Sequence, residues 1–322
     1  MKRFTHINAT TVGEAASALS QYGDKANVIA GGTDLLGQLV GWIRPTQPEY
    51  IINLKTIPGL DSITEDATGL KIGALTRLDD IASSSTVQSK YSVLAQAARK
   101  VASWQIRNMG TIGGNICQDV RCWYFRATWN KFDCLRKNPA GVCQALIGDN
   151  RFQHSIFGAA NGCIAANVSD TAPALIALDA KIVTSENTAG YDAEDFFDGF
   201  NKTVLAADEI ITEIQIPTPP SGSKQAFAKA SMRRAVDFAL ASCAVVIAPA
   251  TGSVTSARVA LGAVAPTPIR ATAAEDALIG NAISEAVAET VAAAAVAGAT
   301  AQIYNKYKIQ LAKGVVKRAI LA

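Results

Sequence analysis

Short apolar runs alternate with polar stretches along the first 56 residues, and their lengths are those of short strands and helices. The runs at 4–7, 27–30 and 50–54 are typical of buried strands. Between residues 11 and 22, apolar residues recur every three or four positions, which is the spacing of one helical face, and Thr11 with Glu14 offers a capping box. We therefore expect three strands, a helix after the first strand and another helix after Asp34.

The middle of the chain predicts a second set of elements. Apolar residues at 63–64 and 70–74 flank a polar turn, which predicts a hairpin. The other elements expected here are helices at 78–82, 93–102 and 171–179, strands at 181–184 and 210–216, and a short helix or turn at 193–200.

A run rich in Pro, Gly and Ser at 217–223 is the best candidate for a linker between domains. Beyond it the composition shifts towards alanine. The elements expected there are strands at 225–230, 243–248 and 256–261 and helices at 271–278, 284–297 and 303–320. This order predicts a separate α+β domain with an antiparallel sheet.

Composition and charge exclude several classes of protein. The chain has 322 residues, of which 49% are hydrophobic and 18% charged, so it is not intrinsically disordered. Its net charge of +3 is spread along the sequence without a basic stripe, which argues against binding to nucleic acid. No apolar run is long enough to span a membrane, and residues 1–8 lack the apolar core of a Sec signal peptide. We expect a cytoplasmic protein, unless a partner with a Tat signal carries it to the periplasm.

Two glycine pairs stand among small polar residues, at 30–34 and 110–115. Glycine lets a backbone approach a ligand that any Cβ would block, and successive N–H groups in such turns can bind phosphate. Neither segment has the spacing of a dinucleotide fingerprint or of a P-loop. The sequence contains only His6 and His154, without a visible Ser-His or Cys-His pairing, so we expect no catalytic residue.

Five of the six cysteines lie between residues 107 and 170. Cys122, Cys134, Cys143 and Cys163 are separated by eleven, eight and nineteen residues, without the Cys-x-x-Cys pairs of zinc ribbons and compact ferredoxins. An irregular loop at 117–163 that donates four thiolates suits a [4Fe–4S] cluster. Unrelated free cysteines and a zinc-stabilised binding module are the alternatives. We interpret Cys117 and Cys243 as packing residues.

These motifs together resemble the flavin-binding medium subunit of molybdenum hydroxylases, the xanthine dehydrogenase and carbon monoxide dehydrogenase family. The resemblance is carried by residues 30–35, 111–115 and 169–170, and extends to 210–217 and 229–234. The cysteine loop is similar to that of 4-hydroxybenzoyl-CoA reductase and of the periplasmic aldehyde oxidoreductases, and its last interval is closer to the latter. The resemblance implies an α+β fold. A two-part FAD-binding domain of the PCMH type (vanillyl-alcohol-oxidase-like) would cover 1–218, with subdomains at about 1–56 and 57–218. A small α+β domain would cover 224–322.

The resemblance also implies ligand residues and partners. The residues expected at FAD are Val28, Ile29, Ala30, Gly31, Gly32, Thr33, Asp34, Leu35, Thr111, Ile112, Gly113, Gly114, Asn115, Asp170, Ile211 and Lys229. Cys122, Cys134, Cys143 and Cys163 would hold the [4Fe–4S] cluster. A large molybdopterin-binding subunit and a small subunit with two [2Fe–2S] centres would be partners, and an external acceptor would take the electrons. A 4-hydroxybenzoyl-CoA reductase-like β subunit and a standalone flavin oxidase of the same fold are the alternatives.

Overall fold

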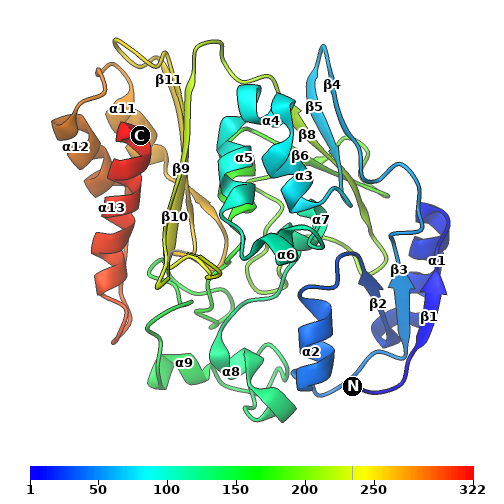
Figure 1. Ribbon diagram of the computed structural model, residues 1–322. Coiled ribbons are helices and arrows are strands. Elements are labelled where there is room, and N and C mark those ends of the chain that lie inside the picture. Colours follow the sequence, from blue (N-terminus) through cyan, green and yellow to red (C-terminus); the bar gives the residue numbers. More distant parts are fainter. Residues whose placement is uncertain (234) are drawn as a thin grey trace.

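The computed structural model describes residues 1–233 and 235–322, so Arg234, the last residue of the 229–234 segment, lies outside the described residues. Three sheets follow one another along the described chain, as Figure 1 shows. The fold is the mixed α/β architecture expected from the sequence, with an antiparallel sheet in the C-terminal part.

The first sheet is parallel and small. Its strands are β1 (Thr5–Asn8), β2 (Ala26–Ile29) and β3 (Tyr50–Asn53), in the order β1-β3-β2. Helix α1 (Val12–Tyr22) is capped by the Thr11 hydroxyl, which accepts from the Glu14 N–H. The Glu14 carboxylate accepts from the N–H of Thr10, one residue before the expected partner. Helix α2 (Leu35–Gly41) follows the first glycine segment.

The second sheet has five antiparallel strands in the order β4-β5-β8-β6-β7. The strands are β4 (Ile63–Asp66), β5 (Gly69–Gly73), β6 (Lys181–Thr184), β7 (Tyr191–Asp192) and β8 (Ile211–Pro217). Helices α3 (Leu78–Ser83), α4 (Ser85–Lys90), α5 (Ser92–Arg99) and α10 (Thr171–Ala177) share the main hydrophobic core with this sheet. The predicted hairpin of β4 and β5 is confirmed.

Between helices α5 and α10 the chain contains only short elements. They are α6 (Trp104–Arg107), α7 (Ile112–Ile116), α8 (Trp123–Arg126), a 3-10 turn (Thr128–Asn130) and α9 (Gln144–Ile147). Helices α8 and α9 lie at the bottom of the molecule in Figure 1, below the sheets. The cysteine segment is therefore irregular, as the sequence predicted.

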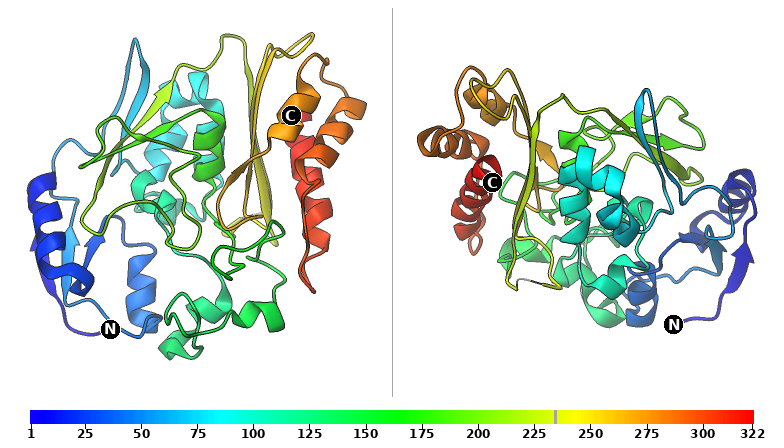
Figure 2. Two further views of the ribbon diagram at one scale, coloured as in Figure 1. Left: turned by 180° about the vertical axis from the view of Figure 1, so that it is seen from behind. Right: turned by 45° about the horizontal axis from the view of Figure 1, so that its top comes forward.

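The C-terminal part is a layer of helices on one antiparallel sheet. Its elements are β9 (Lys224–Ala230), β10 (Ala241–Ala248), β11 (Ser256–Gly262), β12 (Ile269–Arg270), α11 (Thr272–Leu278), α12 (Glu285–Ala295) and α13 (Tyr307–Leu321). The helices cover the outer face of the sheet, as both views in Figure 2 show. The inner face packs on α5 and α10, so this sheet joins the C-terminal part to the part of the chain before it.

Residues 193–200 form turns, one of the two forms expected there. Two helices need correction at their ends. Helix α5 ends at Arg99, and Ala102 has a positive φ of 40°. Helix α13 begins at Tyr307 instead of 303, because the Asn305 side chain accepts from the Gln302 N–H and donates to the backbone of Ser155. In the described part of the chain, none of the helices has the length and apolar character needed to cross a bilayer.

Candidate functional site

A cavity of about 1020 Å³ opens between the first sheet, the second glycine segment and the loop after β9. Its lining includes these residues predicted to bind the cofactor: Val28, Ile29, Ala30, Gly31, Gly32, Thr33, Asp34, Leu35, Thr111, Gly113, Gly114, Asn115, Asp170 and Ile211. Ile112 instead lies fully buried in the main core. Lys229 is not on the cavity wall but contacts Asp170, which is. The volume lies at the upper end of the range of small-molecule sites.

The first glycine segment presents backbone N–H groups to this cavity. Gly32 has a φ of +70°, which turns the chain between β2 and α2. A Cβ on Gly31 would stand 1.9 Å from the Met109 carbonyl oxygen, so only glycine allows the two glycine segments to touch. Among the described residues, no acceptor within the chain is found for the N–H groups of residues 31–35. Backbone groups without an acceptor leave this turn able to bind an anion, as the sequence predicted.

The second glycine segment differs from that expectation, because its N–H groups from Ile112 to Asn115 are engaged within the protein. It forms helix α7, capped by the Thr111 hydroxyl, which accepts from the Gly114 N–H at 3.2 Å. The N–H groups of Ile112 and Gly113 donate to the carbonyls of Thr76 and Ala74. A Cβ on Gly113 would stand 2.9 Å from the Ala74 oxygen. The segment is therefore a closely packed wall of the cavity.

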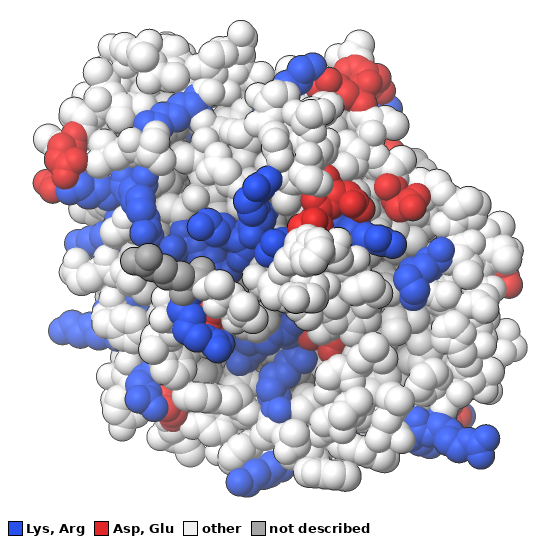
Figure 3. Space-filling model, viewed as in Figure 1, with Lys and Arg blue, Asp and Glu red and all other residues white. Residues whose placement is uncertain are grey.

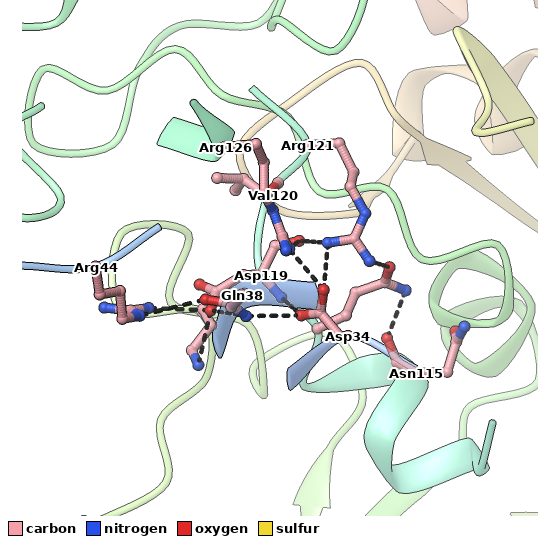
Figure 4. A network of polar contacts seen from close by, with 10 residues as sticks. Asp34, Gln38, Arg44, Asn115, Asp119, Val120, Arg121 and Arg126 are labelled. Atoms are coloured by element: carbon pink, nitrogen blue, oxygen red, sulfur yellow. Dashed lines mark hydrogen bonds and ion pairs between the residues drawn. The ribbon is translucent and has the colours of Figure 1, made fainter. Parts of the chain in front are cut away.

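Asp34 joins the first glycine segment to the cysteine segment. Its carboxylate accepts from Arg121 at 2.6 Å, from Arg126 at 2.7 Å and from the Asp119 N–H at 2.9 Å (Figure 4). Gln38, one turn later in α2, donates to the carboxylates of both Asp34 and Asp119. The Asp34 side chain is therefore committed to the protein, and it holds the start of the cysteine segment against the cavity.

Asp170 places a buried carboxylate at the cavity. It is 4% exposed, and its Oδ2 accepts from Lys229 of β9 at 2.5 Å. Its Oδ1 is buried without a hydrogen-bond partner in the described structure. Burial raises the pKa of Asp170 to about 6, although the ammonium group of Lys229 acts in the opposite direction. A buried carboxylate oxygen without a donor on a cavity wall indicates that a ligand completes its hydrogen bonding.

The cavity also carries positive charge. Arg44, Arg121, Arg136 and Lys202 are among its lining residues. Burial alone would raise the pKa of Asp119, but Lys202 and Arg44 more than offset this and lower it. Lys and Arg side chains also gather across the middle of the face seen in Figure 3. Six carboxylates also line the cavity, so its wall carries charges of both signs: Asp24, Asp34, Asp119, Asp170, Glu209 and Asp237.

The four predicted metal-binding cysteines line a second, smaller cavity together. The Ala165 N–H, two residues after Cys163, donates to Cys163 Sγ at 3.4 Å. Backbone donors of this kind are among the features that tune iron–sulfur clusters. Cys117 lines the large cavity instead, and Cys243 is buried in strand β10.

Cations and a neutral histidine surround these sulfurs. Arg136 Nε donates to Cys163 Sγ at 3.0 Å, and His154 Nε2 lies 3.3 Å from Cys122 Sγ. The Cys143 thiol, followed by Arg136, lowers the pKa of Cys163, whereas burial raises the pKa of Cys122 to about 11. Burial lowers the pKa of His154 to about 4, so its ring is neutral at pH 7.

The space between the four thiols is small, about 10 Å³, which is room for about one water molecule. No group of three or more His, Cys, Asp or Glu side chains in the described residues is close enough to hold one metal ion. A single zinc ion draws its four ligands tightly together, and that arrangement is not found here. A [4Fe–4S] cluster is larger than this space, so binding one would require the cysteine segment to rearrange.

Sequence reasoning missed several residues at the two cavities. Arg44 and Arg121 follow the two glycine motifs by ten and six residues, whereas Lys202 and Phe238 lie far from both in sequence; all four line the large cavity. Arg121 stacks on the Phe238 ring at 4.7 Å. The only sequence signal was the basic character of the segment around Cys122 and Cys134, and it gave no partner for any of these side chains.

The chain is similar to known proteins over most of its length. Residues 2–219 match the family described as FAD binding domain in molybdopterin dehydrogenase, and residues 226–322 match the CO dehydrogenase flavoprotein C-terminal domain. Over 284 residues it is 38% identical to the aldehyde oxidoreductase FAD-binding subunit PaoB of Escherichia coli (strain K12), covering 85% of this chain and 86% of that protein. Over 326 residues it is 31% identical to the carbon monoxide dehydrogenase medium chain of Hydrogenophaga pseudoflava, covering 99% and 96% respectively.

Solved structures give the same picture. A carbon monoxide dehydrogenase from Hydrogenophaga pseudoflava that lacks the Mo-pyranopterin moiety superposes with a TM-score of 0.78 at 32% identity, covering 100% of this chain and 97% of that one. Quinoline 2-oxidoreductase from Pseudomonas putida 86 superposes with a TM-score of 0.75 at 24% identity, and covers 100% and 97%. The latter similarity concerns the fold alone.

Proposed function

The chain belongs to the FAD-binding subunits of the molybdopterin dehydrogenases, and from this premise we propose that it binds FAD in the large cavity as the electron-transfer subunit of a heteromeric molybdenum hydroxylase. The FAD-binding domain would span 1–218 and the C-terminal domain 224–322. As a flavoprotein subunit of an oxidoreductase, the chain would not act on the organic substrate alone.

The shape and donors of the large cavity support FAD. The N–H groups of residues 31–35 would hold the pyrophosphate, because they face the cavity without acceptors of their own. Asp170 Oδ1 would accept from a hydroxyl or N–H of the cofactor. Thr111, Gly113, Gly114 and Asn115 would form the opposite wall, Ile112 would support that wall from the core, and Lys229 would act by holding Asp170.

We further propose that Cys122, Cys134, Cys143 and Cys163 bind a [4Fe–4S] cluster, as in the subgroup with the extra cysteine loop. The observation that carries this proposal is the shared cavity, which all four cysteines line and where Arg136 and the Ala165 N–H both donate to Cys163 Sγ. Arg136 and Lys137 would offset the negative charge of a four-thiolate cluster. Binding would order the segment at the same time, since metal binding couples to folding.

The chemistry of the complex would be divided among subunits. Bound FAD would connect the one-electron iron–sulfur centres of a small partner to an external acceptor, while a large molybdopterin-binding partner would oxidise the substrate. The relative named as an aldehyde oxidoreductase subunit suggests an aldehyde, and those named for carbon monoxide, caffeine and nicotine show that substrate differs between relatives. We propose an aldehyde or an aromatic heterocycle. The complex would work in the cytoplasm, unless a partner with a Tat signal carries it to the periplasm.

The test is to isolate the tagged full chain in two forms, from its source cells with its partners and alone from a recombinant host. The complex should contain molybdenum and FAD and should reduce a dye with an aldehyde or heterocycle. The chain alone should contain FAD, be bleached by dithionite and give no substrate-dependent dye reduction. Turnover by the chain alone would favour a standalone flavin oxidase and contradict the proposal.

A further inference from the structure

The two cavities share a wall. Phe125 and Arg136 line both the large cavity and the one enclosed by the cysteines. Phe125 is 1% exposed, and its ring lies between 5.3 and 5.7 Å from the cationic groups of Arg44, Arg126 and Lys137. The partition between the cavities is thus one aromatic ring with cations around it, together with the Arg136 side chain.

Arg136 is held firmly in this wall. Its Nε donates to Cys163 Sγ at 3.0 Å, its Nη1 to the Phe200 carbonyl at 2.6 Å and its Nη2 to the Gly199 carbonyl at 2.5 Å. Its guanidinium also lies over the Phe200 ring at 5.2 Å. Because the planar fork is fully oriented by these acceptors, the Nε–H is fixed on the sulfur while the side chain faces the large cavity.

His154 contacts a different sulfur on the side away from the large cavity. Its Nε2 lies 3.3 Å from Cys122 Sγ, and His154 is 1% exposed and is not part of the large cavity's lining. Its carbonyl accepts from the buried Lys308 of α13, so it belongs to the contact with the C-terminal helices. Both side chains contact a cysteine sulfur, but only Arg136 also reaches the proposed FAD site.

We propose that Arg136 is a positioning residue that joins the two cofactor sites, setting the reduction potential of the cluster through Cys163 and shaping the wall against which FAD binds. This inference rests on the proposed function. A charged donor to a ligand sulfur stabilises the more negative, reduced cluster and raises its potential. The His154 ring is neutral, so its contact with Cys122 Sγ should change the potential less than Arg136 does.

The experiment uses the full chain, purified without oxygen, with Arg136→Met, Arg136→Lys and His154→Leu variants. The cluster potential is measured by redox titration followed by electron paramagnetic resonance, and FAD affinity by fluorescence titration of the flavin-free protein. Arg136→Met should lower the potential and raise the FAD dissociation constant roughly fivefold or more. Arg136→Lys keeps the charge without the fork, so its potential should fall less. His154→Leu should lower the potential and leave FAD affinity unchanged.

The outcomes distinguish a failure of the proposed function from a failure of the role proposed for Arg136. Wild-type protein without a cluster would overturn the proposed function and this inference with it. Wild-type protein with cluster and FAD, combined with an Arg136→Met variant that changes only one of the two measurements, would overturn the inference alone. The inference alone would also be overturned if His154→Leu weakened FAD binding as much as Arg136→Met does. If Arg136→Met does not fold, Arg136→Lys decides by the same two measurements.

Discussion

The large cavity and the cysteine cavity are built in opposite ways. The large cavity is formed by ends of strands and helices, and its donors are backbone groups already in place. The cysteine cavity lies among helices of four residues, and its thiols close over a space of only about 10 Å³. Regular structure therefore shapes the large cavity in the absence of a ligand. We expect the cysteine cavity to reach its final form only when its ligand binds. Changes in the two regions should have different consequences.

The largest effect should come from Gly31→Val, which changes the wall of the large cavity. The new Cβ would meet the Met109 carbonyl at 1.9 Å, so the two glycine segments would have to separate. We expect loss of bound FAD and a lower free energy of unfolding, by roughly 3 kcal/mol or more. Gly37→Val in α2 is the matched control, because its Cβ would meet nothing within 4 Å and Gly37 does not line the large cavity. Equal FAD content in both purified variants would show that the close approach of the loops is not needed.

Single Cys→Ser changes come next and should separate the cavities. Cys122→Ser, Cys134→Ser, Cys143→Ser and Cys163→Ser should each lose iron and acid-labile sulfide while most of the FAD remains. Cys117→Ser and Cys243→Ser should keep the full iron content, since their sulfurs lie outside the cysteine cavity. If Cys163→Ser keeps an intact cluster and Cys117→Ser loses it, the ligand set is wrong and the fourth ligand lies beside the flavin.

Removal of iron with a chelator should have a smaller effect, and it should affect the cysteine cavity without affecting the large one. Without metal, the segment at 117–163 should become more sensitive to limited proteolysis, because it contains little regular structure to hold it. The 26–35 segment should stay resistant and FAD should remain bound. Mass spectrometry of the fragments locates the cleavage sites. Cleavage at equal rates with and without iron would mean that the segment does not depend on a metal.

The smallest effect concerns pH and Asp170. Burial raises its pKa in the folded protein to about 6, above the usual value of 3.8. The folded protein therefore holds this proton more tightly than the unfolded chain does. The resulting stabilisation is fully present below pH 4 and is lost as the pH rises through 6. In flavin-free protein, the stability of wild type relative to Asp170→Asn should therefore fall between pH 4.5 and 7, by on the order of 2 kcal/mol at most. Urea unfolding at both pH values measures it, and a relative stability that rises with pH would contradict the assignment.

Local patterns were enough to predict the elements of the first sheet, whose strand β2 lines the large cavity. The spacing at 11–22 and the apolar runs at 4–7 and 50–54 correspond to α1, β1 and β3, because burial on one face imposes a period on the sequence. The four cysteines were selected together from their clustering, and they do line one cavity. These features depend on neighbours in the sequence or on an unusual residue type.

Long-range partners could not be predicted. Asp34 binds Arg121 and Arg126, about ninety residues away, and nothing near Asp34 in the sequence indicates them. The two glycine pairs look alike in the sequence, yet the second forms a helix whose N–H groups are engaged by Thr111, Thr76 and Ala74. Which N–H groups remain available depends on tertiary contacts, so the difference between the segments becomes visible only in the structure.

The most direct test of the central claim is the cofactor content of one anaerobically purified sample of the full chain. FAD, iron, acid-labile sulfide and zinc are measured per chain on the same preparation. Occupied sites should give one FAD with four iron and four sulfide and no stoichiometric zinc, as expected for one flavin and one [4Fe–4S] cluster. FAD without iron, after reconstitution with iron and sulfide has been attempted, or zinc in place of iron would contradict the account of the cysteine cavity. Iron without FAD would contradict the account of the large one.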